Sequence, residues 1–280
     1  MTTAPDPNHT PMFDVDVPAP LTHVERLLAL AALYTQHNDR IDLLFSGRAA
    51  AVPDVYVSSA RRLEREALAC VKAVRQQRLP PIEPVPSAVV RLKQTAYLTS
   101  GATRYLTSAQ QSLPPDNARP GARPDPRRGF GQYVRLAREL TALAPATVAE
   151  SARHIADRLL AKAHPHTAVP GMDRAQRDTL LTVARGHVSV TGQYERSSRD
   201  RTAPVDIDVL RHLEVQGLVD RETASAPSPF SGGPPCDRVH LTSLGVSALS
   251  TVIVAPLYAG PSTGRPAPSP PAATTARARR

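Results

Sequence analysis

The sequence is poor in several residue types and patterns that commonly mark a protein's class. Tryptophan is absent and aromatic residues make up only 4% of the 280 residues, so the core must be built from aliphatic side chains. Cys70 and Cys236 are the only cysteines, which excludes a disulfide framework and favours two reduced thiols. No apolar run approaches the ~20 residues of a membrane helix, and the acidic N-terminus has no secretory signal. We therefore expect a soluble, cytoplasmic protein with no membrane partner.

Motifs that signal catalysis are also absent from the sequence. There is no phosphate-binding P-loop, no Gly-x-Gly-x-x-Gly, no Cys-x-x-Cys, no His-Glu-x-x-His and no Gly-x-Ser-x-Gly. His164 and His166 form the only close histidine pair, and no cysteine lies near them to complete a metal site. We expect a protein that is not an enzyme and that uses neither a cofactor nor a metal.

Proline, by contrast, is abundant, and its 29 residues cluster in connectors and near both ends. Residues 1–20 and 258–280 have too few large apolar side chains to fold, so we predict a disordered leader and a disordered tail. A proline-bearing linker at 164–171 separates two segments of different periodicity and charge. The sequence thus predicts a helical domain over 21–163 and a second domain over 172–254.

The N-terminal segment carries apolar residues at helical spacing throughout. Thr22 and Glu25 form a capping box, in which each side chain accepts from the other residue's backbone amide. Thr147 and Glu150 repeat this pattern and predict the start of another helix. Gly101 lies in the middle of a predicted helix, where it indicates close approach of a second helix.

Residues 172–254 alternate between helical and extended patterns. A helical segment ends at Gly186, an extended run covers 188–192, and a second helical segment ends at Gly217, which we expect in the left-handed conformation. The pattern then predicts a strand from Leu218 and a loop over 223–236. After the loop it predicts a strand over 238–242 and a helix over 244–252. This is the element order of a winged helix, so the predicted fold is mostly α, with a C-terminal winged-helix-like α+β domain.

Two stretches of this segment resemble a known pattern. "LRHLEVQGLVDRET" and "DRVHLTSLGVSAL" resemble the second half of MarR- and PadR-type winged-helix domains, and still more closely a domain of uncharacterised actinomycete proteins. The resemblance implies that the helix before "GLV" is a recognition helix and that the protein binds DNA and regulates transcription. Between Gly186 and Val205 we expect a strand or hairpin where the family has a middle helix.

The charge is distributed unevenly along the chain, whose net charge is +9. The leader, 1–20, has three acidic residues and no base, whereas 21–164 has 21 basic against 12 acidic residues. The predicted winged-helix region, 165–254, has nine arginines against ten acids, and 255–280 has four arginines. Since phosphate neutralisation supplies most non-specific DNA affinity, we expect any DNA contact to be led from outside the recognition helix.

Basic residues gather at three candidate nucleic-acid-binding positions. On the helix predicted over 58–77, four of them fall within about 80° of the helical wheel and form either a solvated face or an anion-binding stripe. A loop before the recognition helix is either a phosphate-binding loop or a solvated turn with local ion pairs. The recognition helix itself offers one arginine among Asp206, Asp208 and Glu214. The candidates are Arg61, Arg65, Lys72 and Arg75 on the helix, Tyr194, Arg196, Arg199 and Arg201 in the loop, and Arg211 on the recognition helix.

Two functions remain open. The first is a non-enzymatic DNA-associated or transcription-regulatory protein whose partner is double-stranded DNA. The second is a protein-interaction or dimerisation module that binds no DNA, because a winged-helix fold serves protein contacts equally well. The surface of the C-terminal domain distinguishes them, since a basic face favours DNA and a neutral or apolar face favours a protein partner.

Overall fold

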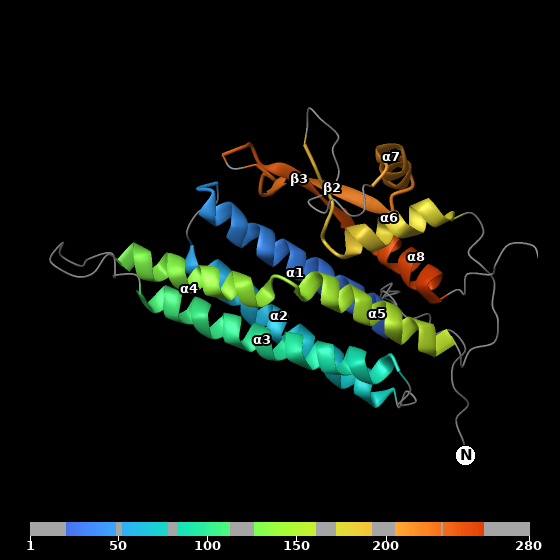
Figure 1. Cartoon of the computed structure of the whole chain (residues 1–280), viewed down its shortest axis with the longest axis horizontal. Coiled ribbons are helices and arrows are strands. Elements are labelled where there is room, and N and C mark those ends of the chain that lie inside the picture. Colours follow the sequence, from blue (N-terminus) through green and yellow to red (C-terminus); the bar gives the residue numbers. More distant parts are fainter. Residues whose placement is uncertain are drawn as a thin grey trace, which may run out of the picture.

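The computed structural model describes residues 21–48, 52–77, 83–112, 126–160, 172–191, 205–230 and 232–254. These residues form a mostly helical protein with one small antiparallel sheet near the C-terminus, as expected (Figure 1). The predicted leader, tail and 164–171 linker all lie outside the described residues.

Five helices make the N-terminal part. They are α1 (His23–Phe45), α2 (Pro53–Gln76), α3 (Val85–Ser112), α4 (Pro126–Thr141) and α5 (Ala144–Leu160). Figure 1 shows them as a long helical layer in which α2 lies beside α3, and α4 and α5 follow each other along the same side of α3. Gly101 permits the close approach of α3 and α4, because a β-carbon there would lie 3.1 Å from the Leu140 side chain.

The predicted helix starts are partly confirmed. The Thr22–Glu25 capping box is present, with Thr22 N donating to Glu25 Oε2 over 2.7 Å and Glu25 N donating to Thr22 Oγ1 over 3.2 Å. The second predicted box is wrong, because α5 begins at Ala144 and both Thr147 and Glu150 lie inside it. A two-residue turn after α4 leads directly into α5, so no free helix end remains at Thr147.

The C-terminal segment has the predicted order of elements. It contains α6 (Arg174–Ala184), β1 (Ser189–Val190), α7 (Ile207–Val215), β2 (Val219–Ala226), β3 (Cys236–Leu241) and α8 (Ser243–Val254). The predicted loop over 223–236 is too long, because β2 extends to Ala226 and β3 begins at Cys236. The sheet order is β1-β3-β2, with both pairs antiparallel and Val219 opposite Leu241. Gly217 has φ 70°, as predicted for the residue that ends α7. The region between Gly186 and Val205 begins with β1, and residues 192–204 lie outside the described residues.

The two predicted domains share one apolar core. A single cluster of buried side chains includes Leu28 of α1, Leu180 of α6, Leu213 of α7 and Leu249 of α8. Helix α1 lies at the centre of this arrangement, because it contacts α2, α4 and α5 as well as β2, α6 and α8 (Figure 1). The sheet and its helices therefore pack on the helical layer, and independent folding of the two segments stays a prediction.

Candidate nucleic-acid interface

The outward face of α2 carries the basic stripe that the sequence predicts. Leu63, Ala67, Cys70 and Val74 are buried, so the opposite face of the helix is open to solvent. Arg61, Arg65, Lys72 and Arg75 are all exposed, and no ion pair joins any of them to another described residue. Leu68 interrupts the stripe and is 53% exposed. The four positive charges are therefore available to an external anion.

Contacts between α2 and α3 fix which residues of α3 adjoin this stripe. Ser100 Oγ donates to Glu64, and Gln110 Nε2 donates to Asp54, so the two helices run antiparallel. At about 100° per residue, the exposed α3 residues in line with the stripe include Lys93, Tyr97 and Arg104. In this register Arg104 lies beside Arg61.

In this register these residues lie on one side of the α2/α3 pair, which we call the α2/α3 basic face. It consists of Arg61, Arg65, Leu68, Lys72 and Arg75 of α2 with Lys93, Tyr97 and Arg104 of α3. The 28 residues of α3 include no aspartate or glutamate. Tyr97 is 79% exposed, the largest exposed fraction of any aromatic side chain among the described residues. Sequence reasoning missed the α3 part, although the absence of acids over 85–112 was a visible signal.

The surface of α7 differs in charge from this face. Arg211 donates to Asp208 over 3.2 Å, and Glu214 pairs with Arg221. Asp206 caps the helix by accepting from Asp208 N over 2.9 Å. The one predicted arginine on α7 is thus engaged in an ion pair within its own helix.

The predicted binding residues are not brought together. Helix α7 lies on the far side of α1 and α5 from α2 and α3 (Figure 1), so Arg211 is remote from the α2 stripe. Tyr194, Arg196, Arg199 and Arg201 lie outside the described residues. Among the predicted residues that the structure describes, Arg61, Arg65, Lys72 and Arg75 share one surface and Arg211 does not.

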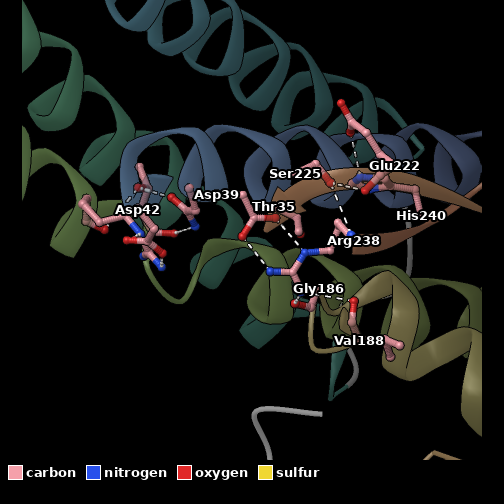
Figure 2. A network of polar contacts seen from close by, with 12 residues as sticks. Thr35, Asp39, Asp42, Gly186, Val188, Glu222, Ser225, Arg238 and His240 are labelled. Atoms are coloured by element: carbon pink, nitrogen blue, oxygen red, sulfur yellow. Dashed lines mark hydrogen bonds and ion pairs between the residues drawn. The ribbon is translucent and has the colours of Figure 1, made fainter. Parts of the chain in front are cut away.

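A buried ion pair holds the sheet against α1 (Figure 2). Arg238 of β3 donates to both carboxylate oxygens of Asp39, each over 2.6 Å. Its remaining nitrogen donates to the carbonyls of Gly186 over 2.9 Å and Val188 over 3.1 Å. Close packing supports this network, because a β-carbon at Gly186 would lie 2.3 Å from Thr35 Oγ1. Sequence reasoning missed the pair, whose members are 199 residues apart.

A second buried polar group lies between α1 and α2. His37 Nδ1 and Ser59 Oγ are 3.0 Å apart, and His37 Nε2 has no partner among the described residues. Burial, reinforced by the positive charges of Arg138 and Arg40, lowers the pKa of His37 to about 4. Ser59 also lines an open hollow of about 430 Å³ that includes Arg40 and Arg62. Because a general base works best with a pKa near the working pH, His37 is poorly suited to activate Ser59.

Neither cysteine thiol is accessible to solvent. Cys70 and Cys236 are both buried and are not joined by a disulfide, and burial raises the pKa of the Cys70 thiol to about 11. Within the described ranges, no group of three or more histidine, cysteine, aspartate or glutamate residues could hold a metal ion.

Comparison with models of protein families, with curated proteins and with solved structures gives no match to this chain. In the part of the chain that the structure describes, no helix is long and apolar enough to cross a membrane. The function is therefore inferred from the geometry of the α2/α3 basic face and of α7.

Proposed function

We propose that the protein is a non-enzymatic, DNA-associated or transcription-regulatory protein whose phosphate contacts come from the α2/α3 basic face. The observation that carries this proposal is the set of exposed, unpaired cations on α2 and their extension onto α3. Each cation that neutralises a phosphate releases a condensed counterion, which is the main source of affinity for nucleic acid. A face with six such cations suits a polyanion better than a small acidic ligand.

We further propose that residues 172–254 form a winged-helix-like domain. The order of α6, β1, α7, β2, β3 and α8 supports this assignment, with 227–235 as the wing between β2 and β3. In such a domain α7 would be the recognition helix. Its charges are satisfied by neighbours, and its acidic residues disfavour approach to phosphates. We therefore expect duplex binding with little sequence preference.

A salt titration of duplex binding by the full chain tests the proposal. Replacing Arg61, Arg65, Lys72 and Arg75 by alanine should weaken binding to all sequences. It should also lower the slope of log affinity against log salt by about 0.9 for each phosphate that the variant no longer neutralises. The matched control changes Arg61, Arg65 and Arg75 to lysine, which keeps the charge and should keep the slope. Equal slopes for the alanine variant and the unchanged protein would refute a role for this face.

The alternative function, a protein-interaction or dimerisation module, is favoured by a separate observation on the C-terminal segment. Val215 at the end of α7 is 87% exposed and Leu244 at the start of α8 is 57% exposed. Thr242 Oγ1 donates to Gly217 O over 2.6 Å, which holds these two helix ends near each other. An apolar area beside a helix without free charge suits a protein partner.

Light scattering across a concentration series tests self-association through this area. If the alternative holds, Val215→Ser should shift the protein towards monomer, whereas Leu143→Ser, at a 77% exposed position between α4 and α5, should not. A monomer at every concentration would remove self-association from consideration.

A further inference from the structure

The shape of the α2/α3 basic face limits how it can meet a nucleic acid. Two packed helices have axes about 8–10 Å apart and are each about 10–12 Å across, so the pair is roughly 20 Å wide. The major groove of B-DNA is only about 12 Å wide. A face formed jointly by α2 and α3 can therefore touch the phosphates of a duplex, but it is too broad to reach the base edges inside the groove.

Tyr97 adds an exposed aromatic ring to the same face, and phosphate binding does not require such a ring. Its ring is 79% exposed, and Lys93 lies one helical turn before it on the same side of α3. Arg104 lies two turns after it and Leu68 of α2 is opposite, in the register set by the Glu64–Ser100 contact. An aromatic ring surrounded by cations is the arrangement on which unpaired bases stack in single-strand-binding proteins.

We propose that the α2/α3 basic face binds single-stranded nucleic acid, with Tyr97 stacking against an unpaired base and the surrounding cations holding the phosphates. The inference rests on the proposed nucleic-acid function and specifies its ligand. In a duplex the bases are already stacked on each other, so the Tyr97 ring gains a base contact only when the strands are separated. DNA and RNA single strands share the recognised chemistry, a flat base beside a phosphate chain.

Fluorescence anisotropy with the full chain tests this proposal. The probes are oligothymidine, oligouridine and a mixed-sequence duplex, each about 20 nucleotides long, a length that spans one or more single-strand sites. We expect at least one single strand to bind more tightly than the duplex. Tyr97→Ala should weaken single-strand binding by about 5- to 150-fold, the loss typical of one stacked base, and should weaken duplex binding much less.

Two controls separate stacking from charge and from folding. Tyr97→Phe keeps the ring and should bind as the unchanged protein does, and thermal melting checks that each variant is folded. Tyr97→Ala should leave the slope of log affinity against log salt unchanged, because stacking releases no counterion. Lys93→Ala and Arg104→Ala should each lower that slope by about 0.7, the value for one phosphate contact on a single strand.

The outcomes distinguish this inference from the function on which it rests. Binding of only one of the two oligonucleotide types supports the proposal and shows which of oligothymidine and oligouridine the face binds. Duplex binding as tight as single-strand binding, with no effect of Tyr97→Ala, overturns the inference and leaves the proposed DNA function standing. Absence of binding to all three probes at low salt overturns both.

Discussion

At the scale of single residues, His37 makes the stability of the protein depend on pH. Burial holds the pKa of His37 near 4 in the folded protein, whereas an exposed histidine in the unfolded chain titrates near 6.5. Between these values the unfolded state binds a proton that the folded state does not, so stability falls as pH falls through this window. The difference between these two pKa values corresponds to about 3 kcal/mol at most.

We predict that His37→Gln removes much of this dependence. Denaturant unfolding from about pH 7 to about pH 4.5 should show a free energy of unfolding that falls less steeply in the variant than in the unchanged protein. His212→Gln, at an exposed position of α7, is the control for the substitution itself. Parallel slopes for His37→Gln and the unchanged protein would mean that His37 is not the group responsible.

At the scale of elements, the sequence predicts helix starts and ends well where these depend on interactions between adjacent residues. The Thr22–Glu25 box and the end of α7 at Gly217 are correct because each depends on a few adjacent residues. The predicted box at Thr147 fails because the turn between α4 and α5 moves the helix start. The basic residues of α2 can be recognised in the sequence. Which residues of α3 lie beside them depends on how the two helices pack, and the spacing of residues within one helix does not predict that register.

Gly217, at the junction between α7 and β2, allows one of these local predictions to be tested. Gly217 has φ 70°, and a β-carbon added there would meet no atom within 4 Å. The cost of adding a side chain at this position would therefore come from the backbone conformation alone and not from a steric clash with neighbouring atoms. We predict that Gly217→Val destabilises the protein by about 1–2 kcal/mol or more, measured by denaturant unfolding. Gly217→Asn should cost clearly less, because asparagine tolerates the left-handed region. Equal losses for both variants would contradict this explanation.

At the scale of the whole molecule, the Asp39–Arg238 pair couples the two segments that the sequence predicts as separate domains. Both side chains are almost fully buried, with 6% and 3% exposure, and they join α1 to β3. The coupling was invisible in the sequence because neither residue stands in a recognisable motif and 199 positions separate them. Removing one partner of such a pair leaves an uncompensated buried charge, which typically costs about 3–5 kcal/mol.

We predict that Arg238→Met lowers the free energy of unfolding by about 3–5 kcal/mol and speeds proteolysis between the two segments. The double variant Asp39→Asn, Arg238→Met should recover part of that loss, because no unpaired charge remains. Arg138→Met is the matched control. Arg138 makes the same two-bonded contact to Asp42, over 3.0 and 2.9 Å, but with side chains 21% exposed and within the helical layer. Arg138→Met should lower the free energy of unfolding by less than Arg238→Met does. It should also leave the rate of proteolysis between the segments unchanged. Arg238→Met could instead resemble Arg138→Met in both measurements. In that case the apolar core shared by α1, α6 and α8 would be sufficient to hold the segments together. The buried pair would then only set their orientation.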